Sequence, residues 1–171
     1  YDQGLTRMAD EVLQVIEAVQ SGKGYANIDP GLVERITRQE IAKGRGFKAT
    51  VKAVRSVLHQ VGGAYMPVVP PYAEWLRTFT SLPKDPVDPT LRIFCREKMR
   101  FHASTRERLP VVEAFYEQTL SGLGEEESLL DLACGLNPLA LPWMPLKPDA
   151  QVILHDIFSD MLEGRPLPGI M

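Results

Sequence analysis

The sequence predicts an α/β protein, in which a helical N-terminal region precedes the opening strand, helix and strand of an α/β domain. Up to about residue 120, apolar residues recur at three- and four-residue spacing between helix caps and breakers. Beyond that point the pattern changes to two short apolar runs of strand type, SLLDLAC (128–134) and QVILHDI (151–157). We therefore expect a helical domain over residues 1–109 and the start of an α/β domain over residues 110–171.

Three helices are predicted in the first 61 residues. In the first, residues 5–20, the apolar side chains share one face: Leu5, Met8, Val12, Val15, Ile16 and Val19. Asp29-Pro30 is an N-cap followed by proline at the first helical position, which predicts a second helix to about Lys43. The third helix covers residues 47–61 and ends at Gly62-Gly63.

Three more helices are predicted before the strands. The proline-rich MPVVPPY stretch (66–72) requires an extended connection, and a helix from about Tyr72 to Leu82 follows it. Asp88-Pro89 repeats the cap signal and opens a long helix, and residues 110–120 form the last one. Another helix, beginning near Leu139, is expected between the two strands. Because two parallel strands do not make a stable open sheet, we expect the chain to continue beyond Met171.

Charge is distributed unevenly along the chain, whose formal net charge is -3. Residues 31–60 carry a net charge of +5, residues 92–108 carry +4, and residues 111–171 carry −8. A basic front half on an acidic rear half indicates that the front half meets a polyanion such as a nucleic acid. The alternative is that these long side chains form ordinary solvated helix faces.

Other classes of protein are disfavoured by composition. No apolar run approaches the roughly 20 residues that a membrane span needs, and the N-terminus lacks the layout of a signal peptide. Cys95 and Cys134 lie far apart, with neither metal-type nor redox-type spacing. We expect a reduced, cytoplasmic protein with no metal site.

The stretch LLDLACGLNPLALPWM (129–144) carries the strongest chemical signal. Gly135 follows the first predicted strand, and Asp156 ends the second one 21 residues later. In open α/β sheets ligands bind beyond the carboxyl ends of the strands, where glycine permits close approach and an acid accepts hydrogen bonds from a ribose diol. The spacing fits nucleoside binding, but a single glycine with a later acid is also compatible with an ordinary strand that ends in a proline turn.

Longer motifs sharpen this interpretation. LLDLACGLNPLALPWMPL, together with FHASTRERLP and LHQVGGAYM, resembles the aminoglycoside-resistance methyltransferases that act on 16S ribosomal RNA, over residues 8 to 156. The resemblance implies a Rossmann-like S-adenosylmethionine-dependent methyltransferase domain. It also implies methyl transfer to N7 of a guanine (nucleotide 1405) in the decoding site of the 30S subunit, which gives aminoglycoside resistance.

The resemblance also implies roles for individual residues. Arg108 becomes a candidate partner for the methionine carboxylate, since a guanidinium binds a carboxylate bidentately, and Tyr65 is expected to face the cofactor pocket rather than only anchor a loop. The predicted cofactor-binding residues are Tyr65, His102, Ala103, Ser104, Arg108, Ala133, Gly135 and Asp156. The predicted RNA-binding residues are Arg35, Arg38, Lys43, Arg45, Lys48, Lys52 and Arg55.

No catalytic acid, base or nucleophile is predicted, because guanine N7 already holds an in-plane lone pair. Cys134, Trp143 and Met144 are expected to be buried, and Asp131 either hydrogen-bonds a neighbouring loop or helps to position the sulfonium. Without the resemblance, a surface polar cluster at a helix cap is the favoured interpretation of His102 and Ser104. Two other functions remain open: a non-catalytic RNA- or ribosome-binding module with a degenerate nucleoside pocket, and an S-adenosylmethionine-dependent enzyme acting on another substrate.

Overall fold

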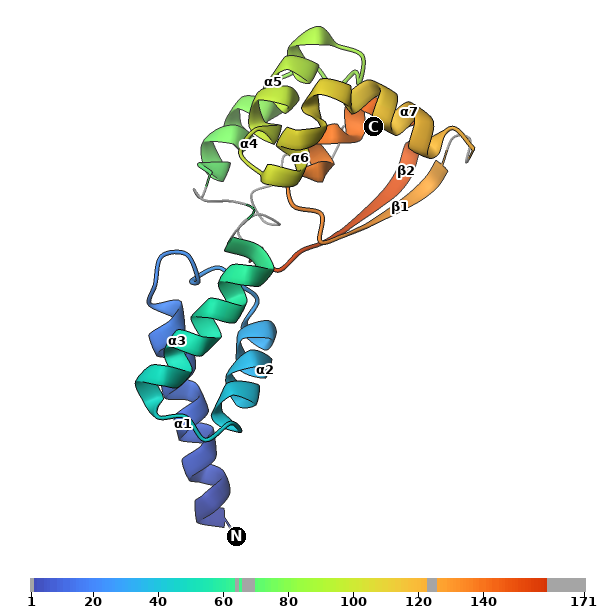
Figure 1. Cartoon of the computed structure of the whole chain (residues 1–171). Helices are drawn as coiled ribbons and strands as arrows, with labels where there is room; N and C mark the ends of the chain where they lie inside the picture. The colour runs from blue at the N-terminus through green and yellow to red at the C-terminus, as the bar shows by residue number, and fades with distance from the viewer. Residues whose placement is uncertain (1, 64, 66–69, 123–125, 160–171) are drawn as a thin grey trace. The chain divides into compact units, whose positions relative to one another are not determined.

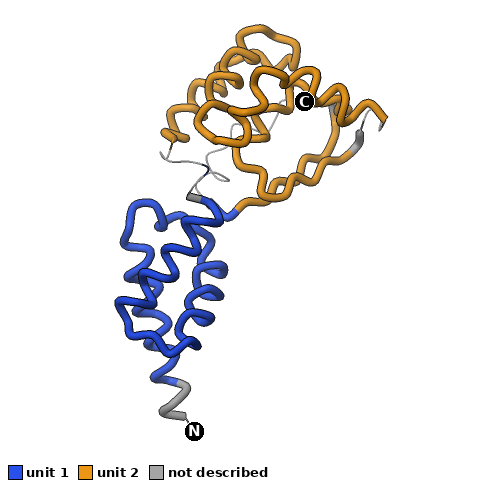
Figure 2. Tube along the Cα trace, viewed as in Figure 1, with its two compact units in different colours: residues 1–67, 157–159 blue, residues 68–156, 160–171 orange. Residues whose placement is uncertain are grey.

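The computed structural model describes residues 2–63, 65, 70–122 and 126–159 and contains two compact units (Figure 1). Figure 2 shows their extents: unit 1 comprises residues 1–67 and 157–159, and unit 2 comprises residues 68–156 and 160–171. The first boundary between the two compact units along the chain therefore lies between residues 67 and 68. The functional boundary expected after residue 109 stays a prediction.

Unit 1 contains the three helices predicted for the first 61 residues. They are α1 (Asp2–Gln20), α2 (Pro30–Ile41) and α3 (Phe47–Leu58), and a π-helical turn, η1 (His59–Gly63), follows α3. The predicted cap is confirmed, because Oδ1 of Asp29 accepts a hydrogen bond of 2.8 Å from the amide of Leu32. This bond satisfies one of the donors that a helix start leaves unpaired.

The apolar faces of α1, α2 and α3 pack into one core. Its buried members are Val15, Val19, Ile28, Val33, Ile36, Val54 and Leu58. Met8, which the periodicity assigned to the same face, is instead 54% exposed. The segment 157–159 packs on this unit, where Ile157 accepts a hydrogen bond of 2.7 Å from the amide of Asp29 and Phe158 contacts the core.

Unit 2 begins with four helices and a short 3-10 turn. They are α4 (Tyr72–Thr80), α5 (Pro89–Met99), α6 (Ala103–Arg108), the turn η2 (Leu109–Val111) and α7 (Val112–Leu120). Asp88 caps α5 as predicted, accepting from the amides of Thr90 and Leu91. Helix α6 was not predicted, because ASTRER holds no apolar periodicity and six residues are too few to reveal one.

The two predicted strands form a parallel pair (Figure 1), β1 (Glu126–Leu132) and β2 (Leu146–His155). Leu129 pairs with Val152, and Leu132 pairs with His155. Between the strands the structure has a 3-10 helix, η3 (Asn137–Trp143), instead of a helix beginning near Leu139. Pro138 and Pro142 explain the difference, because neither can donate a backbone hydrogen bond to a continuing α-helix.

The two sides of this strand–helix–strand unit differ in burial. Residues 138–143 of η3 are all buried, which confirms the core position of Trp143, while Met144 is only half-buried. On one face of the sheet, Leu130, Leu132 and Ile153 are 59%, 66% and 48% exposed. No helix within the described ranges is both long and apolar enough to span a membrane.

Candidate functional site

The ends of β1 and β2 meet at a sharply turned loop. Ala133 and Gly135 both have positive φ, at 52° and 49°, a conformation that L-residues adopt at a cost and glycine adopts freely. The amide of Cys134 donates to the carbonyl of His155 (3.1 Å), and the amide of Gly135 donates to Oδ2 of Asp156 (2.8 Å). The structure thus brings together the glycine and the acid that the sequence paired.

His102 lies directly against this loop. A Cβ placed on Gly135 would come within 2.9 Å of Nε2 of His102, so no larger residue fits without moving the imidazole. Nδ1 of His102 lies 2.9 Å from Oγ of Ser104, at the start of α6. Burial lowers the pKa of His102, the charge of Asp156 opposes this shift, and Arg108 adds to it. The ring therefore favours its neutral form.

Arg108 ends α6 and is held by three neighbours. Its Nε donates to the carbonyl of Ser104 (3.1 Å), and its Nη1 donates to the hydroxyl of Tyr116 (3.4 Å). Its guanidinium carbon lies 5.4 Å from the ring centre of Phe115, in a cation–π contact. No described residue accepts a hydrogen bond from Nη2, so the Nη1–Nη2 edge keeps donors for a carboxylate.

Tyr116 and Asn137 connect Arg108 to the first strand. The hydroxyl of Tyr116 donates to Oδ1 of Asn137, and Nδ2 of Asn137 donates to Oδ2 of Asp131 (2.7 Å). Of the two roles expected for Asp131, the structure supports the hydrogen bond to a neighbouring loop. Tyr116 was not predicted as a site residue, since a single tyrosine inside a predicted helix gives no local signal of a functional role.

The remaining predicted cofactor residues differ in position. Ala103 and Ser104 begin α6 beside His102, and Ala133 is exposed at the end of β1. Tyr65 belongs to unit 1, where its amide donates to Gly62 and its side chain is 47% exposed. The expectation that Tyr65 faces the cofactor pocket therefore stays a prediction.

Cys95 and Cys134 are both buried, and neither forms a disulfide with a described residue. Burial raises the pKa of Cys95 to about 12, so its thiol stays protonated and unreactive near neutral pH. Cys134 is a small buried residue in the loop, as expected. Within the described ranges, no three His, Cys, Asp or Glu side chains are grouped to hold a metal ion.

The seven basic residues predicted to bind RNA form two groups, one without and one with a partner among the described residues. Arg35, Lys48 and Lys52 are exposed and form no ion pair with a described residue. The others have partners: Arg38 pairs with Glu34 at 2.7 Å, Lys43 and Arg45 both pair with Glu40, and Arg55 donates to the carbonyl of Ala18 at 2.5 Å. Arg55 also lies over the ring of Tyr25, so its guanidinium, which is only partly exposed, is held at the end of α1.

The second basic segment is largely engaged inside unit 2. Arg92 donates to the carbonyl of Pro142 (2.9 Å), and Arg96 donates to the carbonyl of Leu109 (3.0 Å). Both guanidinium groups lie over the indole of Trp143, 5.5 Å and 5.4 Å from its ring centre. These contacts attach η3 to α5.

Comparison with known proteins identifies the family. Residues 21–165 match the family model described as ribosomal RNA methyltransferase (FmrO). A 16S rRNA (guanine(1405)-N(7))-methyltransferase from Micromonospora echinospora is 37% identical over 155 residues, which are 90% of this chain and 57% of that protein.

Two solved structures share the fold. The 16S rRNA methylase RmtB matches with a TM-score of 0.67 at 29% identity, covering 89% of this chain and 56% of that one. The 16S rRNA methyltransferase RmtF in complex with S-adenosyl-L-homocysteine also gives a TM-score of 0.67, at 27% identity over 90% of this chain and 56% of that one. The chain thus spans little more than half the length of these relatives, and the predicted fold class and family are confirmed. This chain belongs to the FmrO family of ribosomal RNA methyltransferases.

Proposed function

We propose that this chain binds S-adenosylmethionine beside the loop at residues 133–135. We further propose that the protein to which it belongs transfers the methyl group to N7 of guanine 1405 in 16S ribosomal RNA. The observation that carries this proposal is the hydrogen bond between Gly135 and Asp156 at the carboxyl ends of two parallel strands. Arg108 is connected to β1 of the same pair through Tyr116 and Asn137. Relatives that share this segment carry the name of that activity.

Each group in the site has a chemical task in this proposal. Oδ2 of Asp156 supports the loop, and a carboxylate at this position can accept hydrogen bonds from a ribose diol. The free edge of Arg108 binds the methionine carboxylate. His102, with Ala103 and Ser104, shapes the wall opposite Gly135, and the neutral imidazole adds no positive charge beside a sulfonium.

The proposed methyl transfer requires no acid, base or nucleophile from the protein. S-adenosylmethionine supplies a methyl group that is already activated by its sulfonium. Guanine N7 attacks with its own lone pair, so no side chain has to remove a proton. The residues of this chain act by orientation and by excluding water, which account for much of the rate in such transfers.

The proposed RNA partner is the 30S subunit, which unit 1 contacts through Arg35, Lys48 and Lys52. Exposed basic side chains bind phosphates and release counterions, and they position the protein without reading the base sequence. Methylation of N7 removes a hydrogen-bond acceptor and adds a positive charge in the decoding site. Resistance to aminoglycosides that bind there is the expected biological result.

Two measurements test the proposal. Calorimetric titration should show S-adenosylmethionine binding that Asp156→Ala weakens at least about tenfold, because a charged acceptor contributes roughly 1.5–3 kcal/mol. Asp156→Asn is the matched control, since its amide oxygen can still accept from Gly135, so a loss in both variants assigns the effect to the charge.

Incubation with 30S subunits followed by mapping of the modified nucleotide tests the substrate. Binding without methylation would favour a non-catalytic module, and methylation at another position would favour a different substrate. An absence of any cofactor binding by the wild-type protein would refute the proposal.

A further inference from the structure

A line of four side chains crosses unit 2 from α6 to β1. Arg108 donates to Tyr116 at 3.4 Å, Tyr116 donates to Asn137, and Asn137 donates to Asp131 at 2.7 Å. The line joins α6 and α7 to the start of η3 and to β1, the elements on either side of the loop that carries Gly135. Its donors all point the same way, from the cationic guanidinium towards the anionic carboxylate.

Tyr116 is the central member of this line. It is only 5% exposed, so its hydroxyl has little water to replace a missing partner. Burial raises the pKa of Tyr116, with Asp131 adding to the shift, while Arg108 and the hydrogen bond with Asn137 oppose it. The phenol therefore remains a neutral donor, and its oxygen accepts from Arg108 while its proton goes to Asn137.

The contacts of Arg108 determine which of its donors remain available. Nε is used by the carbonyl of Ser104, and one Nη1 hydrogen is used by Tyr116. A planar guanidinium held at these two points keeps a fixed orientation. The edge that no described residue uses, with Nη2 and the second Nη1 hydrogen, therefore faces one direction.

We propose that Tyr116 is a positioning residue for the amino-acid end of the cofactor. Its hydroxyl connects the guanidinium of Arg108 to Asn137 and Asp131, so that the edge that no described residue uses is oriented for a carboxylate before the ligand arrives. This inference rests on the proposed function, because it assumes that Arg108 binds that carboxylate. A competing explanation is that the hydroxyl only stabilises the fold.

Tyr116→Phe tests the idea, since it removes the hydroxyl and keeps the ring that packs on Phe115. Two nucleosides serve as probes: S-adenosylhomocysteine, which carries the amino acid, and 5′-methylthioadenosine, which lacks it. The variant should lose about three- to tenfold in affinity for S-adenosylhomocysteine, the range for one hydrogen bond. Affinity for 5′-methylthioadenosine should change by less than about twofold. Tyr25→Phe is the control for loss of a tyrosine hydroxyl elsewhere.

The decisive quantity is the affinity for S-adenosylhomocysteine divided by the affinity for 5′-methylthioadenosine. Both probes report on the same folded molecules, so partial unfolding of the variant cancels in the ratio. Arg108→Met should lower the ratio, and adding Tyr116→Phe to it should lower the ratio no further. An unchanged ratio in Tyr116→Phe, including equal weakening of both probes, would overturn the positioning role. Additive effects on the ratio in the double variant would also overturn it. Failure of the wild-type protein to bind either probe would instead overturn the proposed function.

Discussion

The two basic segments of this chain have similar net charges but different uses. Residues 31–60 and 92–108 carry net charges of +5 and +4, and both suggested a surface for RNA. In the first segment Arg35, Lys48 and Lys52 are exposed without an ion pair to any described residue. In the second, Arg92, Arg96 and Arg108 bind carbonyl groups and aromatic rings within unit 2.

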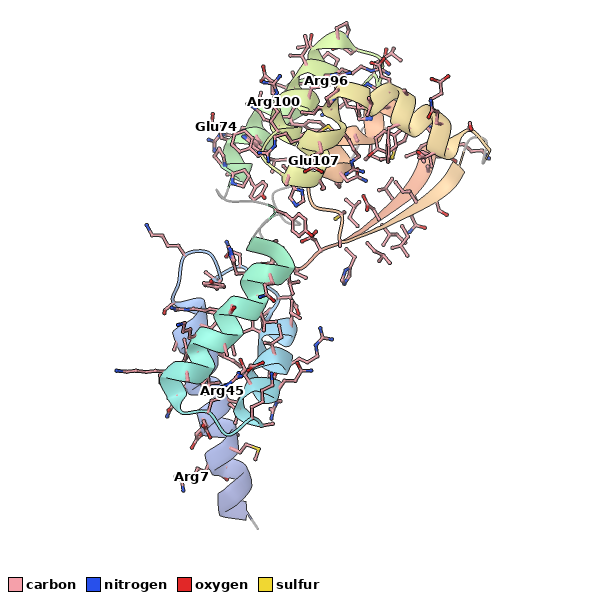
Figure 3. All side chains as sticks on the ribbon, viewed as in Figure 1. Arg7, Arg45, Glu74, Arg96, Arg100 and Glu107 are labelled. Atoms are coloured by element: carbon pink, nitrogen blue, oxygen red, sulfur yellow. The ribbon has the colours of Figure 1, made fainter. Side chains whose placement is uncertain are left out.

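The difference teaches that the charge of a segment does not measure the charge available to a partner. A guanidinium can donate up to five hydrogen bonds and lie flat on an aromatic ring, so it serves equally well as an internal connector. Of the second segment, Arg100 and Arg106 are exposed (Figure 3 labels Arg96 and Arg100). The RNA contact is therefore expected to depend on unit 1 more than on residues 92–108.

The largest expected effect is a loss of stability when an arginine of the second segment is replaced. Arg96→Met should lower the free energy of unfolding by about 2–3 kcal/mol, because it removes a charged hydrogen bond and a cation–π contact. Urea denaturation followed by circular dichroism measures this change. Arg100→Met, just beyond the end of the same helix but exposed, is the control and should shift stability by less than about 0.5 kcal/mol. Equal effects would show that the contacts of Arg96 contribute nothing.

Arg55 provides a second test of the comparison. It lies in the first basic segment, but its guanidinium makes internal contacts, as the arginines of the second segment do. Arg55→Met should cost about 1–2 kcal/mol of unfolding free energy, since Ala18 loses its donor and Tyr25 loses its cation. Lys52→Met, on the same helix, should be nearly neutral in the same denaturation assay. If Arg55→Met is also neutral, Arg55 returns to the set of residues available to RNA.

Local sequence signals predicted the helices and the chemical edge of the sheet. Asp29-Pro30 and Asp88-Pro89 specify helix starts through bonds that span three residues, so no tertiary information is needed. Gly135 and Asp156 were paired because parallel strands place their carboxyl ends side by side. Each inference depended on a rule of local geometry or of strand order.

The rest required the folded structure. Tyr116 and Asn137 are 21 residues apart, and neither is unusual in its own segment. The exposure of Lys48 and the burial of the Arg55 contacts follow from how α3 packs on α1, which periodicity alone does not specify for charged residues with long apolar stems. The type and start of η3 were not predicted, because apolar spacing alone does not distinguish an α-helix from a 3-10 helix that contains Pro142.

Charge reversal in unit 1 is expected to have an intermediate effect on RNA binding. Replacing Arg35, Lys48 and Lys52 together with glutamate should weaken binding to the 30S subunit at least about tenfold, and the slope of log affinity against log salt should fall by about 0.7–0.9 for each phosphate that the variant no longer binds. Filter binding over a salt series measures both quantities. Reversal of Arg100 and Arg106 is the matched control from unit 2.

Cofactor affinity should be unaffected by the reversal in unit 1, because the residues proposed to hold the cofactor nucleoside and carboxylate lie in unit 2. Identical salt slopes for the unit 1 variant and the wild-type protein would contradict a phosphate-binding role. In that case the three side chains form a solvated surface.

The smallest expected effect concerns Glu40, which explains why Lys43 and Arg45 are less available than their neighbours. The hydrogen bond from Lys43 holds the pKa of Glu40 below its ordinary value; burial opposes this, and the charges of Lys43 and Arg45 add to it. A carboxylate with a lowered pKa in the folded state contributes stability above its unfolded pKa, about 4.3, and that contribution disappears as pH falls through the folded value. Because both cations are about half exposed, the contribution should be only about 0.5–1 kcal/mol.

Glu40→Gln should therefore lower the free energy of unfolding at neutral pH. The stabilities of the variant and the wild-type protein should converge at pH values below the folded pKa of Glu40, which urea midpoints at several pH values can show. Glu17→Gln, on the exposed side of α1, is the control for the loss of a surface carboxylate. A difference in stability between wild type and Glu40→Gln that stays constant over these pH values would mean that the pairing with Lys43 and Arg45 does not stabilise the fold.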